Sequence, residues 1–101
     1  MNKGGDCFLA SYHLIMEQND LILVHGIVTG QGDLNGVRYA HAWCERGDMV
    51  LDYSNGRRLE IPKILYYAIG NILESNLYRY THRQACGFAV ETEHSGPWED
   101  L

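Results

Sequence analysis

The chain has 101 residues, a formal net charge of −5 and a hydrophobic fraction of 46%. This length suits one hydrophobic core, so we expect a single domain over residues 1–101. The basic residues form no patch, which argues against nucleic-acid binding. No apolar run reaches the roughly 18–20 residues of a membrane span, and the first residues do not resemble a signal peptide. Three cysteines without Cys-x-x-Cys spacing indicate reduced thiols in a cytoplasmic protein.

The first third of the chain predicts a helix and then a strand. We expect the helix to begin at Cys7 with Asp6 as its cap, because apolar residues then recur at helical spacing. The nearly continuous apolar run over residues 21–29 predicts a strand within a sheet. Residues 30–36 form a glycine-rich loop without the Gly-Lys-Ser/Thr of a phosphate-binding loop, so we expect no nucleotide and no cofactor.

The middle of the chain predicts an antiparallel hairpin. Residues 37–45 and 48–53 are rich in strand-forming side chains, and turn residues separate them. If Arg46-Gly47 is the centre of the turn, His41 pairs directly with Asp52. If the turn lies one residue later, the two side chains are diagonal neighbours on the same face and still within reach.

The second half predicts mainly helix. Residues 57–61 form a short connection or strand, and Pro62 begins a helix that is apolar on most sides. A short extended segment at residues 77–80 follows this helix. Thr81, followed three residues later by glutamine, predicts a capping box and a second helix. We expect Trp98 in the tail to fold back onto the body. A helix, three or four antiparallel strands and further helices predict an α+β fold, with the first helix packed on a small sheet.

Three side chains in this layout have the chemistry of a nucleophile, a base and an orienting acid. Cys7 lies at a helix start, where the macrodipole and free N–H groups stabilise a thiolate. His41 with Asp52 is an imidazole oriented by a carboxylate. Each also has a structural explanation, namely a buried cysteine and a polar cross-strand pair. Their combination in one chain favours catalysis.

A zinc site is the less favoured interpretation of the same residues. It would require His41, Cys44 and Cys7 to share one metal. Side chains three residues apart on a strand point to opposite faces, so His41 and Cys44 cannot easily do so. We therefore expect no metal, and we interpret Cys44 and Cys86 as small core residues.

Four segments occur in a characteristic order: G-D-C at a helix start, L-V-H-G-I-V-T-G on a strand, H-A-W-C-E on the next strand and M-V-L-D-Y after it. They resemble the transglutaminase-like branch of the papain-like cysteine hydrolases. The resemblance implies a minimal papain-like core with Cys7 as nucleophile, His41 as general base and acid, and Asp52 as orienting group. It implies acyl transfer from a peptide, protein or amide through a thioester. The remaining half resembles small bacterial or phage members with the same core.

The chain departs from this family at the oxyanion site. Papain-type enzymes place a glutamine several residues before the cysteine, whereas this chain has only Asn2 as a weak substitute. Trp43, on the same strand face as His41, is a second weak candidate for contact with substrate. The missing glutamine and the short chain leave an alternative, a catalytically inactive papain-like domain that binds another protein through an apolar surface around Trp98 and residues 66–67.

Overall fold

The computed structural model describes residues 6–32 and 35–101 and has an α+β fold, as the sequence predicted. In chain order, its elements are α1 (Cys7–Glu17), β1 (Ile22–Thr29), β2 (Arg38–Arg46), β3 (Met49–Asp52), η2 (Ser54–Gly56), β4 (Leu59–Pro62), α2 (Lys63–Gly70), η3 (Glu74–Asn76), β5 (Tyr78–Tyr80) and α3 (His82–Thr92). None of the helices in the described ranges is long and apolar enough to cross a membrane.

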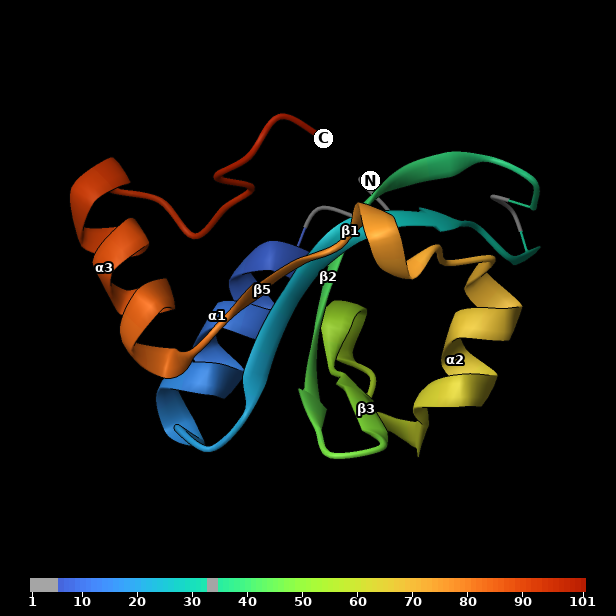
Figure 1. The fold of residues 1–101 in the computed structure, drawn as a ribbon, viewed down its shortest axis with the longest axis horizontal. Helices are drawn as coiled ribbons and strands as arrows, with labels where there is room; N and C mark the ends of the chain where they lie inside the picture. Colours follow the sequence, from blue (N-terminus) through green and yellow to red (C-terminus); the bar gives the residue numbers. More distant parts are fainter. Residues whose placement is uncertain (1–5, 33–34) are drawn as a thin grey trace.

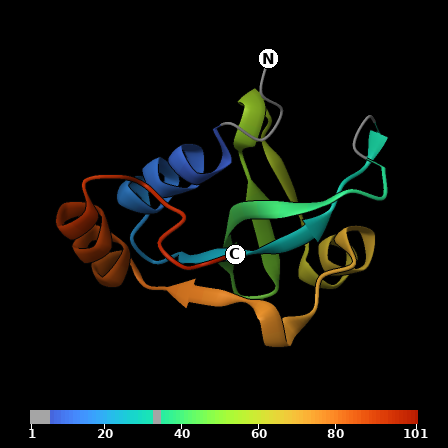
Figure 2. The ribbon, with the colours of Figure 1, turned by 90° about the horizontal axis from the view of Figure 1, so that it is seen from above.

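The five strands form one antiparallel sheet in the order β4-β3-β2-β1-β5. Figure 1 shows α1 and α3 on one side of this sheet and α2 on the other, and Figure 2 shows the same separation from above. The expected count of three or four strands was too low, because the short strands β4 and β5 complete the two edges.

The core divides into two clusters, because successive strand residues point to opposite faces of a sheet. One cluster packs beneath α1 and α3 and contains Leu14, Ile15, Leu21, Leu23, Cys44, Leu51, Tyr80 and Ala85. The other faces α2 and contains Val24, Val28, Trp43, Val50 and Ile72. Trp98 packs against the first cluster, so the tail folds back as predicted.

The hairpin turn centres on Gly47 and Asp48, one residue later than a turn centred on Arg46 and Gly47. Arg46 pairs with Met49 across the turn. Gly47 has a φ of 57°, a left-handed backbone that glycine adopts without strain and that tight hairpin turns require at their first central position. The second of the two expected registers is therefore the right one.

The start of α1 and the end of α2 differ from the local predictions. Asp6 makes no side-chain cap on α1, which corrects our expectation. Its carboxylate instead accepts hydrogen bonds from the backbone N–H of Asn55, at 2.8 and 3.0 Å. The helix expected from Pro62 through the apolar run ends at Gly70, because Asn71 takes a left-handed conformation (φ 49°) that terminates it. The capping box at Thr81 is confirmed.

Candidate active site

His41 and Asp52 form a buried pair on the face of the sheet that carries α2. With the observed turn they are diagonal neighbours on β2 and β3. Nε2 of His41 lies 2.9 Å from Oδ2 of Asp52, and the two residues are 4% and 1% exposed. The imidazole is therefore fixed by a carboxylate with almost no exposed surface.

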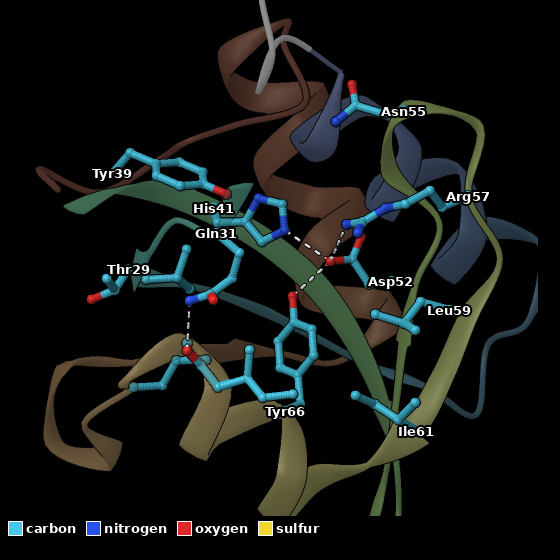
Figure 3. A pocket seen from close by; sticks show the side chains of 14 residues that line it. Thr29, Gln31, Tyr39, His41, Asp52, Asn55, Arg57, Leu59, Ile61 and Tyr66 are labelled. Atoms are coloured by element: carbon cyan, nitrogen blue, oxygen red, sulfur yellow. Dashed lines mark hydrogen bonds and ion pairs between the residues drawn. The ribbon is translucent and has the colours of Figure 1, made fainter. Parts of the chain in front are cut away.

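Asp52 accepts further hydrogen bonds from three other parts of the chain. Ser54 donates to Oδ1 from its backbone N–H (3.1 Å) and its hydroxyl (2.7 Å). Tyr66 on α2 donates to Oδ2 at 2.6 Å, and Arg57 lies 3.3 Å from the same oxygen (Figure 3). Burial alone would raise the pKa of Asp52, but the bonds from His41, Tyr66 and Ser54 hold it far below its usual range. The carboxylate is therefore ionised.

The His41 ring is protonated at neutral pH. Burial lowers the pKa of His41, but the hydrogen bond to Asp52, the Cys7 side chain and the charges of both groups raise it to about 9. Nδ1 makes no hydrogen bond with any described residue, the Cys7 sulfur included. Because Nε2 is occupied by Asp52, Nδ1 is the ring nitrogen that remains without a partner.

Cys7 reaches this ring although the body of α1 packs on the opposite side of the sheet. The ladder between β2 and β3 covers residues 44–46 of β2, so His41 lies beyond its end. The start of α1 is fixed at this end by the bonds from Asn55 to Asp6. Cys7 is a free cysteine with 0% exposure. The thiol is therefore closed to solvent in this structure.

A cavity of about 430 Å³ opens in front of the His41–Asp52 pair (Figure 3). Its walls come from α2, β4 and the ends of β1 and β2. The lining residues are Val28, Thr29, Gln31, Tyr39, His41, Asp52, Asn55, Arg57, Leu59, Ile61, Tyr66, Ile69, Gly70 and Ile72. A cavity lined by both aliphatic and polar side chains suits an organic substrate group. Cys7 is not among the lining residues.

The other candidate site residues singled out from the sequence do not line the cavity beside His41 and Asp52 in the described part of the chain. Trp43 is fully buried and stacks near the His41 ring, with centroids 6.1 Å apart. Its indole N–H donates to Glu45 at 3.0 Å, so it shields the ring and does not line the cavity. Asn2 lies outside the described residues. Cys44 is fully buried, as expected for a core residue, whereas Cys86 is only half-buried.

The thiol of Cys44 has a raised pKa. Burial and the charges of Asp52 and Glu45 raise the pKa of the Cys44 thiol to about 12. Its sulfur donates to the Ser11 carbonyl at 3.4 Å. Cys44 is therefore a protonated structural thiol. Within the described ranges, no cluster of three His, Cys, Asp or Glu side chains is arranged to hold a metal.

Sequence reasoning left four residues that border the pair outside the catalytic site: Tyr39, Ser54, Arg57 and Tyr66. Tyr39 has a local signal, because it lies two residues before His41 and so shares its strand face. Ser54 follows Asp52 closely and forms a short side-chain-to-backbone turn of a kind that aspartate favours. Tyr66 and Arg57 have no such signal, since their place depends on how α2 and β4 pack.

The chain was compared with protein families, curated proteins and solved structures. No protein-family model, no curated protein and no solved structure matches the chain. The family resemblance therefore stays a prediction, and any function must be argued from the site itself.

Proposed function

We propose that this protein is a cysteine-dependent hydrolase or acyl transferase in which Cys7 is the nucleophile, His41 the general base and acid, and Asp52 the orienting group. The observation that carries the proposal is an imidazole whose Nε2 lies on a buried carboxylate and whose Nδ1 has no hydrogen-bond partner among the described residues, with Cys7 among the groups that raise its pKa. A nucleophile beside a base that a third group orients is the arrangement that activates cysteine in acyl transfer.

The reaction follows from these positions. The Cys7 thiolate bonds to the carbonyl carbon of the substrate, and the π electrons move to the carbonyl oxygen. When the carbonyl reforms, the bond to the leaving group breaks, and an amine leaving group takes the proton from Nδ1 of His41. Water or an amine then attacks the thioester, gives its proton to Nδ1 and releases Cys7 as thiolate. Asp52 remains ionised and holds Nε2 throughout.

The substrate class that we propose is a peptide, protein or other amide. The cavity beside His41 has room for a side chain of such a substrate, and its aliphatic lining residues suit an apolar side chain. We also propose a cytoplasmic location, because all three cysteines are free thiols.

Alkylation by iodoacetamide tests the proposed nucleophile. At about pH 6 an ordinary thiol is almost entirely protonated. We expect Cys7 to be alkylated faster than Cys44 and Cys86 in the folded protein, because the protonated His41 stabilises its thiolate. Peptide mapping by mass spectrometry measures each rate. His41→Ala provides the contrast, since it removes the imidazolium and leaves the cysteines in place. Equal rates at Cys7 and Cys86 in the wild-type protein would contradict the proposal.

The burial of Cys7 favours a second candidate function, a catalytically inactive domain that binds another protein. A nucleophile must meet its substrate, and this thiol has no exposed surface. The apolar binding surface that we expected is not continuous, because Trp98 packs on the α1 side and Tyr66 and Tyr67 on the α2 side. Complete protection of Cys7 from alkylation in the folded protein would favour this candidate.

A further inference from the structure

The wall of the cavity carries several polar side chains, and most of their donors are already used inside the protein. Tyr66 and Arg57 both donate to Asp52, at 2.6 and 3.3 Å. The amide nitrogen of Gln31 donates to the carbonyl of Ile69 at 3.0 Å. These donors hold the site together, and using one on a substrate would break an existing bond.

Tyr39 differs from this group. No hydrogen bond joins its hydroxyl to another described residue. The residue lies on β2, lines the cavity, and packs the edge of its ring against His41 with centroids 5.6 Å apart. Figure 3 shows its hydroxyl directed toward the His41 ring. The cavity wall therefore presents an unused O–H donor beside the imidazole.

The surroundings of this hydroxyl keep it protonated. Burial raises the pKa of Tyr39, and the charges of Asp52 and Cys7 raise it further, against the opposing effect of Arg57. Cys7 contributes to the raised pKa of both Tyr39 and His41. The hydroxyl keeps its proton at neutral pH and remains a donor.

We propose that the Tyr39 hydroxyl donates a hydrogen bond to the carbonyl oxygen that becomes negatively charged when Cys7 attacks. The inference rests on the proposed function and fills the position for which this chain lacks a glutamine. As the bond from sulfur to carbon forms, the π electrons move to this oxygen, and the Tyr39 O–H bond stabilises the charge. As the carbonyl reforms and the leaving group departs, the charge disappears. Tyr39 keeps its proton in both steps.

The test compares acylation with alkylation in Tyr39→Phe, which removes only the hydroxyl and keeps the ring on His41. Acylation is measured as the burst of p-nitrophenol released from p-nitrophenyl acetate, and alkylation as the rate of iodoacetamide labelling at Cys7. Attack on an ester creates an oxyanion, whereas alkylation at a saturated carbon does not. We therefore expect acylation to slow by about 100-fold, the usual effect of losing one oxyanion donor, and alkylation to keep the wild-type rate.

Tyr78→Phe is the matched control, because Tyr78 lies on β5 away from the cavity and is 45% exposed. It should acylate like the wild-type protein. A wild-type acylation rate in Tyr39→Phe would overturn this inference and leave the proposed function standing. An equal fall in acylation and alkylation would also overturn it, because Tyr39 would then act on Cys7 and not on the oxyanion. A wild-type protein that shows neither reaction would overturn both proposals.

Discussion

At the scale of single residues, Asp52 controls the charge of the whole site. Its carboxylate is 1% exposed and accepts hydrogen bonds from His41, Ser54 and Tyr66, with Arg57 nearby. A buried charge is tolerated only when it is paired and hydrogen-bonded in this way. Protonation of the imidazole therefore depends on this carboxylate.

We expect Asp52→Asn to lower the pKa of His41 from about 9, because burial is then opposed only by Cys7. The free energy of unfolding should fall by about 3 kcal/mol, as when one partner of a buried ion pair is removed. NMR titration of the His41 ring and urea unfolding measure the two effects. Asp48→Asn, which removes the same charge from the exposed turn, should change neither.

The pH at which the stabilisation by His41 is lost should fall in the same variant. In the wild-type protein the folded-state pKa of His41 is raised, so its contribution is complete below the unfolded value of about 6.5. That contribution is lost as the pH rises through about 9. In Asp52→Asn the folded-state pKa is lower, so the contribution of His41 is lost at a lower pH than in the wild-type protein. Parallel pH profiles for the two proteins would refute the assigned role of Asp52.

At the scale of elements, the C-terminal segment stabilises the side of the sheet opposite the cavity. Glu99 accepts a hydrogen bond from Nδ1 of His25 at 2.8 Å and another from the Tyr80 hydroxyl. Trp98 packs beside the same histidine, with centroids 5.1 Å apart. Gly96 also approaches the ring so closely that a Cβ there would lie 2.8 Å from its Cε1 atom. The tail is therefore an integral part of the α1–α3 layer.

We expect Glu99→Gln to lower the free energy of unfolding by roughly 1.5 kcal/mol, the value of a hydrogen bond to a charged group. The amide has one accepting oxygen where the carboxylate has two, so either His25 or Tyr80 loses its acceptor. Chemical denaturation at neutral pH measures the change. Asp100→Asn removes the same charge one residue later, at an exposed position, and should have no effect. Equal stabilities of the two variants would show that the segment is not held through Glu99.

The elements also show what the sequence could predict. The capping box at Thr81 and the apolar periodicity of α1 are local signals, and both elements form where expected. The strands β4 and β5 have four and three residues, too few for a clear alternation. The end of α2 is set by Asn71, whose left-handed conformation a pattern of apolar residues does not reveal.

At the scale of the whole molecule, the sheet separates two layers. The layer of α1, α3 and the tail holds one core cluster, and the other face carries α2 and the cavity. Cys7 belongs to the first layer but acts on His41 in the second, because the start of α1 lies beyond the end of the β3 ladder. The order of the motifs predicted that Cys7 and His41 act together. The burial of Cys7 and the hydrogen bond from Tyr66 to Asp52 depend on long-range packing, which a local sequence pattern does not reveal.

The central claim is that Cys7 forms an acyl-enzyme with the help of His41. The most direct measurement is peptide mapping after brief exposure of the folded protein to p-nitrophenyl acetate and quenching in acid, which preserves a thioester. The account predicts an acetyl group on Cys7 in the wild-type protein and none on Cys7 in His41→Ala. Acetylation spread over surface lysines, with Cys7 unmodified, would contradict it.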